Sequence, residues 1–86
     1  MNDEESIATL KNLGPKSADW LRENGVATVG DLRRLGPGVA YLLVKSRRPR
    51  ASLNLLWALA AGLQGRDWRD LSATAKLKLR REVSAA

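Results

Sequence analysis

The spacing of apolar and polar positions divides the chain into short helical segments. Ile7 and Leu10 are three residues apart, which places two side chains on one face of a helix, and they predict a first helix near residues 6–10. Further apolar groups at helical spacing follow, separated by glycine, proline and asparagine. They predict helices over about residues 15–24, 28–35, 37–47, 51–63 and 72–83. No segment alternates apolar and polar residues as a strand does, so the pattern predicts an all-α fold.

The ends of these segments carry residues that begin or stop helices. Thr28 followed three residues later by Asp31 is a variant capping box, with a hydroxyl at the N-cap and an acid in the first turn. Gly25 suits the position after a helix, and Ser72 suits an N-cap. Pro49 disfavours helix in the residue before it, so the fourth segment ends there.

The segment from Ala51 to Leu63 is apolar nearly all round, which is typical of a helix buried at the centre of a bundle. Trp57 lies inside it and is expected in the core, whereas Trp20 is the aromatic residue best placed for partial exposure. The apolar set of the preceding helix is Val39, Ala40, Leu43 and Val44, and that of the last helix is Ala75, Leu79 and Val83. We expect one domain over residues 1–86, with an ordered core over about 6–83.

A tight turn over residues 10–18 is the segment with the clearest functional chemistry. Gly14 can adopt a backbone conformation closed to other residues, and Pro15 has the fixed φ of a first helical position. The amides that follow have no partner inside the helix, so with Lys16 they form an anion site. The turn resembles the hairpin of helix-hairpin-helix modules, with Asn12 in place of one glycine, since asparagine tolerates the left-handed region. An ordinary helix N-terminus without a ligand has the same local sequence.

The net charge of +6 is concentrated in two groups of cations. Lys45, Arg47, Arg48 and Arg50 fall within six residues that contain no acid. Lys76, Lys78, Arg80 and Arg81 form the second group, relieved only by Glu82. Clustered Lys and Arg predict a polyanionic partner and salt-sensitive binding, although basic surface residues also serve to keep a small protein soluble.

The chain contains no cysteine and no histidine, which excludes disulfides, thiolate zinc sites and catalysis by either residue. The nine acids form no recognisable metal or acid–base constellation. We therefore expect no catalytic residue, no metal, no cofactor, no small-molecule substrate and no enzyme activity. The longest apolar run, residues 55–63, is too short to span a bilayer, and the N-terminus is acidic, so we expect a cytoplasmic prokaryotic protein without a membrane partner.

Three blocks of residues together give the chain a family resemblance. They are Leu13-Gly14-Pro15-Lys16-Ser17 with the later Thr28-Val29-Gly30-Asp31-Leu32, then Ser52 to Leu59, then Gly65-Arg66-Asp67-Trp68 with Leu71. In this order and spacing, over most of residues 7–82, the chain resembles the C-terminal domain of TfoX/Sxy, bacterial regulators of competence for DNA uptake. The resemblance implies a compact bundle of five to six short helices, of the helix-hairpin-helix or SAM-like type. Full-length members carry an additional N-terminal domain, so we expect a free-standing C-terminal domain.

Two functions of different classes remain open from the sequence. In the first, the domain contacts the DNA backbone non-specifically, and the expected nucleic-acid-binding residues are Asn12, Gly14, Lys16, Ser17, Arg47, Arg48 and Arg50. In the second, it is a protein-interaction module that modulates a transcription factor or polymerase, and its cations meet an acidic partner. We expect a monomer or a weak homodimer in either case.

Overall fold

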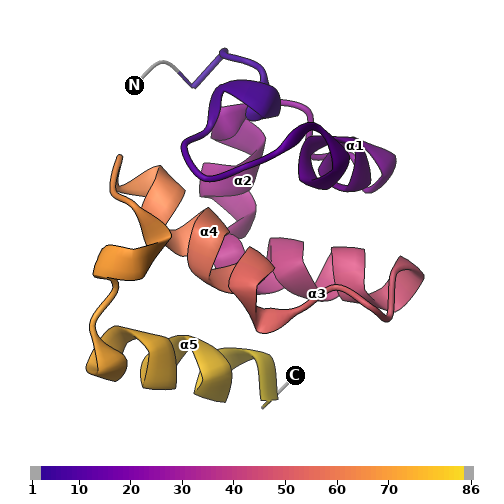
Figure 1. Cartoon of the computed structure of the whole chain (residues 1–86). Helices are drawn as coiled ribbons and strands as arrows, with labels where there is room; N and C mark the ends of the chain where they lie inside the picture. The colour runs from indigo at the N-terminus through magenta and orange to yellow at the C-terminus, as the bar shows by residue number, and fades with distance from the viewer. Residues whose placement is uncertain (1–2, 85–86) are drawn as a thin grey trace.

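The computed structural model describes residues 3–84, which fold into short helices joined by tight connections (Figure 1). The all-α prediction is confirmed: the only β pairing in this range is an isolated antiparallel bridge between Ser6 and Thr28. The elements are the 3₁₀ turn η1 (Ile7–Thr9), α1 (Pro15–Glu23), α2 (Val29–Leu35), α3 (Pro37–Arg47), α4 (Leu53–Leu63), the 3₁₀ turn η2 (Trp68–Asp70) and α5 (Ala73–Ser84).

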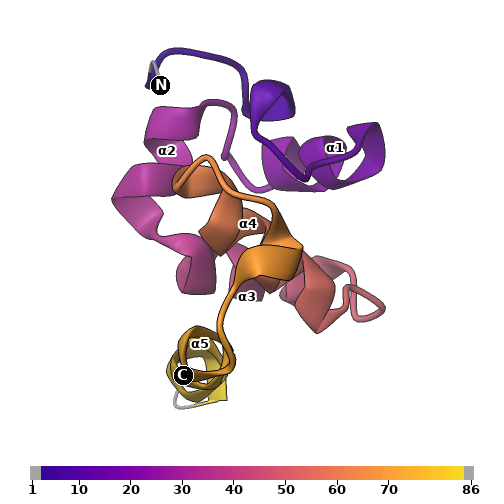
Figure 2. The same ribbon diagram turned by 60° about the vertical axis from the view of Figure 1, so that its left-hand side comes forward.

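Helix α4 is the centre of the molecule, as its apolar sequence predicts. Its Leu56, Leu59 and Ala61 are completely buried, and Trp57 is 8% exposed. Figures 1 and 2 show α4 between the N-terminal elements on one side and α5 on the other. Burying this many apolar side chains in a chain of this size makes α4 the main source of hydrophobic stabilisation.

The helix boundaries follow the capping residues identified in the sequence. The Thr28 side chain accepts from the backbone N–H of Asp31, and the Asp31 carboxylate accepts from that of Thr28, which completes the capping box. Gly25 follows α1 with φ 81°, a left-handed conformation that glycine adopts readily. The Ser72 hydroxyl accepts from the N–H of Ala75 and caps α5.

The apolar set expected for α3 is divided between the core and the surface. Ala40 and Val44 are fully buried together with Tyr41, whereas Val39 is 49% and Leu43 36% exposed. Residues 40, 41 and 44 share one face of the helix, and residues 39 and 43 lie beside it, so the face that carries the aromatic ring of Tyr41 is the one that turns inward. An exposed apolar stripe therefore remains on α3.

Helix α5 packs more loosely than α4. It has no fully buried residue, and its stripe of Ala75, Leu79 and Val83 is half-buried, on the side expected from the sequence. Val83 approaches α3 at Gly38, where an added Cβ would lie 3.7 Å from its side chain. No helix within residues 3–84 is long and apolar enough to cross a membrane.

Candidate nucleic-acid interface

We refer to the turn between η1 and α1 as the hairpin turn; its unusual backbone conformation lies at one residue only. Asn12 has φ 79°, so it occupies the position that a glycine would usually take, as expected. Gly14 does not use the conformational freedom of glycine: its φ of −88° and ψ of 172° are extended values open to any residue. Gly14 is the N-cap of α1, and N-cap residues adopt this extended conformation. A Cβ added there would meet nothing within 4 Å.

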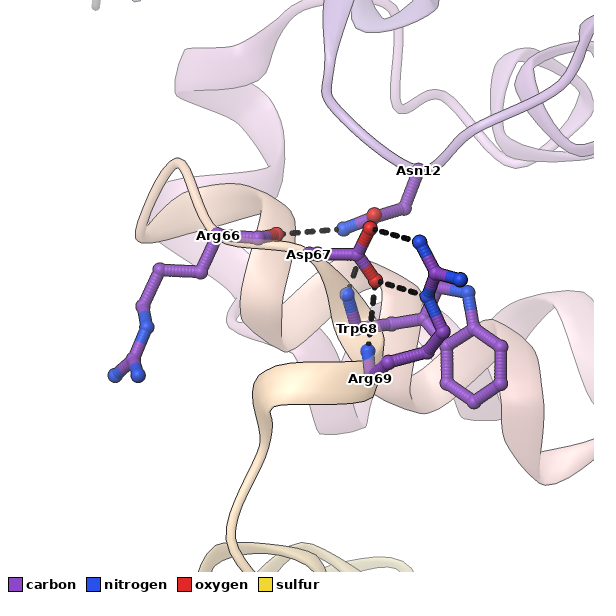
Figure 3. Close-up of polar contacts among 5 residues, drawn as sticks. All are labelled: Asn12, Arg66, Asp67, Trp68 and Arg69. Atoms are coloured by element: carbon purple, nitrogen blue, oxygen red, sulfur yellow. Dashed lines mark hydrogen bonds and ion pairs between the residues drawn. The ribbon is translucent and has the colours of Figure 1, made fainter.

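The side chain of Asn12 is used by the fold (Figure 3). Its Nδ2 donates to the carbonyl of Arg66 at 2.9 Å and more weakly to that of Ala58 at 3.4 Å. Its Oδ1 accepts from the backbone N–H of Trp68 at 3.2 Å. These bonds attach the hairpin turn to the middle of α4, to the connection that follows α4 and to η2, so the Asn12 amide positions the turn instead of binding a ligand. The sequence holds no signal for the partners, which lie more than forty residues away.

A second contact brings the turn down onto α4. Gly62 is buried, and a Cβ added to it would lie 2.7 Å from the carbonyl oxygen of Lys11 and 2.8 Å from Cγ of Leu10. Separations below 3.0 Å are too close for a side-chain atom against backbone. Only glycine at this position lets the turn sit directly on α4, so Gly62 is a positioning residue that the sequence analysis did not identify.

The connection beneath the turn is fixed by an ion pair between Asp67 and Arg69 (Figure 3). The carboxylate accepts from the Arg69 backbone N–H at 2.9 Å and from its guanidinium at 2.9 and 3.0 Å. The guanidinium hydrogen bond, followed by the backbone one, lowers the pKa of Asp67 from 3.8 to about 2. Asp67 is therefore ionised at neutral pH, and both of its carboxylate oxygens accept hydrogen bonds from Arg69.

Helix α1 begins without a side-chain cap. Gly14 has no side chain to offer, and the first hydrogen bond of the helix runs from the N–H of Ala18 to the Gly14 carbonyl at 3.1 Å. The amides of Lys16 and Ser17 precede that bond, so the helix leaves them without a partner. Partial positive charge at a helix N-terminus attracts anions, and Lys16 adds a full charge beside it.

The four cations between residues 45 and 50 have different roles. Lys45 donates from Nζ to the carbonyls of Pro49 and Ala51, both at 2.7 Å, and so shapes the loop after α3. Arg48 forms an ion pair with Glu23 at the end of α1. Arg47 and Arg50 are exposed and form no ion pair or hydrogen bond through their side chains with residues 3–84.

The fold brings the hairpin segment and this loop together, although more than thirty residues separate them. Nζ of Lys16 and Cζ of Arg48 lie 5.5 and 6.0 Å from the centroid of the Trp20 ring, within range of a cation–π interaction. Beside them is a surface cleft of about 310 Å³, lined by Asn12 and Ser17 of one segment and Arg50 of the other. We refer to it as the hairpin cleft.

The residues expected at the site from the sequence thus lie close together in the fold. Arg47, the last residue of α3, lines a shallow hollow with Arg48 and Arg50 of the loop that follows. Gly14 directly precedes the α1 amides. The second group of cations lies elsewhere, on α5, which Figures 1 and 2 place at the opposite end of the molecule from η1 and α1. One of its members, Lys76, lies 5.8 Å from the ring of Trp57.

No group of three acidic side chains within residues 3–84 lies close enough to hold a metal ion. The groups at the hairpin cleft and the start of α1 are backbone amides, hydroxyls and cations, which are the groups that bind phosphate.

Comparisons with known proteins give a family and a fold. The family described as "TfoX C-terminal domain" matches residues 3–83. Two crystal structures of Listeria monocytogenes proteins, one described as uncharacterized and the other as of unknown function, are each 24% identical in sequence. The first has a TM-score of 0.84 over 93% of this chain and 91% of its own, and the second 0.83 over 92% and 98%. No curated protein matches the chain.

Proposed function

Because the chain belongs to the TfoX C-terminal domain family, we propose that this competence-regulator-related domain binds the DNA backbone without reading its sequence. One observation carries the proposal: the uncapped start of α1 and the cationic loop over residues 47–50 lie side by side around Trp20. Two separate segments then present positive charge to one partner, as a phosphate backbone requires.

The contacts available are of the kind that position a protein on DNA. The amides of Lys16 and Ser17 with the Lys16 ammonium can hold one phosphate, and Arg47 and Arg50 can reach others with charge-assisted hydrogen bonds. Arg48 already pairs with Glu23, so it contributes less. A few phosphate contacts support only weak binding, with a Kd of roughly 10⁻⁴–10⁻⁶ M at physiological salt.

Replacing Lys16, Arg47, Arg48 and Arg50 together by glutamine tests the proposal. We expect this variant to weaken binding to duplexes of unrelated sequence alike, and to flatten the dependence of log Kd on log salt concentration. Fluorescence anisotropy of labelled duplexes over a range of salt concentrations measures both quantities.

The matched control replaces Lys76, Lys78, Arg80 and Arg81 of α5 by glutamine. It removes the same charge from a different part of the surface and should leave most of the salt dependence in place. Equal losses in the two variants would show that net charge alone drives the binding and would contradict a site at the hairpin.

Exposed apolar side chains at the end of α2 and along α3 favour a second candidate function, that of a protein-interaction module. Leu35, Val39 and Leu43 are 39%, 49% and 36% exposed, and Leu35 and Leu43 line one shallow pocket with Arg34. Exposed apolar residues grouped in this way are a common feature of protein-binding surfaces. If the wild-type domain fails to bind any duplex at low salt, this function replaces the first.

A further inference from the structure

The hairpin cleft combines an apolar lining with polar groups at its edge. Trp20 of α1 and Trp68 of η2 both line it, together with Leu55 and Ala58 of α4. Two indoles from elements almost fifty residues apart contribute to one cleft, and each is only partly buried. Aromatic side chains beside a basic surface are the usual platform for unpaired bases, because every base has a π-face.

Most of the polar side chains around the cleft are not used by the fold. Ser17, Arg50, Ser52 and Asn54 line it, and none of these side chains forms a hydrogen bond or ion pair with the described part of the chain. Asn12, the remaining polar side chain of the lining, has both ends of its amide occupied. The free groups include hydroxyl and amide donors and acceptors and one guanidinium, which suit a base edge and a phosphate.

Ser52 differs from the other hydroxyl residues that begin helical segments. Ser6, Thr28 and Ser72 each accept a hydrogen bond from a backbone amide of the helix or turn that they precede. Ser52 precedes α4 and makes no such bond. The cleft is therefore bordered by unfilled hydrogen-bonding capacity on two helices, at Ser17 of α1 and at Ser52 and Asn54 of α4.

We propose that the hairpin cleft binds one unpaired nucleotide, with the base against the indoles and the phosphate at Arg50. The inference rests on the proposed function and narrows it: the domain prefers single strands or frayed ends to intact duplex, because a paired base is not accessible to the cleft. The volume of about 310 Å³ lies at the lower end of the range for small-ligand sites, in keeping with one nucleotide. A free mononucleotide and a nucleotide within a strand share this chemistry.

The three tryptophans of the chain provide an internal readout. Trp20 and Trp68 line the cleft, whereas Trp57 is buried in α4 and does not. In an NMR titration with deoxyadenosine 5′-monophosphate or a six-nucleotide single strand, we expect the indole N–H resonances of Trp20 and Trp68 to shift. The resonance of Trp57 should keep its position. Inorganic phosphate at the same concentration should leave all three unchanged.

Arg50→Gln and Arg47→Gln form a matched pair, because each removes one exposed charge from the same basic segment and only Arg50 lines the cleft. We expect Arg50→Gln to weaken mononucleotide binding about tenfold, the effect of losing one charge-assisted hydrogen bond. Arg47→Gln should change it by less than about twofold. An unchanged Trp57 signal verifies that each variant is folded.

The possible results separate this inference from the proposed function. If the domain binds duplex in a salt-dependent way, but neither the mononucleotide nor the six-nucleotide strand shifts the Trp20 and Trp68 signals, the nucleotide site is overturned. The proposed binding to the DNA backbone is then left intact. Mononucleotide binding that depends on Arg50, in a domain that binds no duplex, supports the site and contradicts the proposed function. Equal effects of Arg47→Gln and Arg50→Gln on mononucleotide binding would also overturn the site.

Discussion

Asn12 holds the hairpin turn through two independent features, its left-handed backbone and the hydrogen bonds of its amide. Asn12→Gly keeps the backbone conformation and loses the bonds, so it should lower the free energy of unfolding by about 1–3 kcal/mol. Asn12→Ala loses both features and should cost about 1 kcal/mol more, because alanine is strained at positive φ. Urea denaturation of the three proteins measures the difference. Equal stability of the glycine and alanine variants would contradict this role of the backbone.

Asp67 and Asp31 make the fold sensitive to acid. Hydrogen bonds from Arg69 lower the pKa of Asp67 from 3.8 to about 2, and the backbone N–H groups of Ala27 and Thr28 lower the pKa of Asp31. Between pH 3.8 and about pH 2, the Asp67 carboxylate is protonated in the unfolded chain but still ionised in the folded chain, and the pKa of Asp31 moves in the same direction. The free energy of unfolding that their hydrogen bonds contribute above about pH 4 is therefore lost as the pH falls toward 2. Asp67→Asn should reduce this fall in thermal melts between pH 5 and pH 2. An unchanged pH dependence would show that the ion pair is not formed in solution.

Single-residue properties could be predicted from the sequence where the cause is local. The left-handed Asn12, the capping box of Thr28 and the glycine after α1 depend on neighbours within a few residues. The extended conformation of Gly14 does not follow from the sequence, because a glycine before a proline fits both a left-handed turn and an extended N-cap. The contact at Gly62 depends on a residue more than fifty positions away.

Helix α4 is the element on which the stability of the fold depends most. Leu56→Ala removes a fully buried side chain and should lower the free energy of unfolding by about 2–5 kcal/mol, a large part of the roughly 5–15 kcal/mol of a small domain. Leu77→Ala on α5 is the matched control, because Leu77 is 50% exposed and should cost less than about 1 kcal/mol. A melting temperature unchanged by Leu56→Ala would exclude α4 as the core.

Helix positions follow from the sequence more readily than helix faces. The five α-helices within residues 3–84 occur where apolar spacing and caps place them. The buried face of α3 does not follow from spacing, because Tyr41 adds an aromatic side chain to one of two apolar faces. Which face turns inward depends on the volume left by α4, which is a property of packing and not of α3 alone.

At the scale of the whole molecule, the candidate interface is produced by tertiary contacts. The two basic segments could each be recognised in the sequence, but their meeting around Trp20 and the cleft beside them depend on how α1 and α3 pack. The backbone N–H of Trp68 donates to the Asn12 side chain, and this bond holds η2 against the turn beside the cleft. These contacts join residues that are far apart in the chain, so they cannot be inferred from the spacing of residues along the sequence.

The most direct test of the account is a titration of the ¹⁵N-labelled domain with a short duplex, followed through its backbone amide signals. We predict shifts concentrated at Lys16, Ser17, Arg47, Arg48 and Arg50 that diminish steeply as salt is added, with little change along α5. The absence of any shift at low salt and near-millimolar concentration, or shifts centred on the exposed residues Leu35, Val39 and Leu43, would contradict DNA binding at the hairpin.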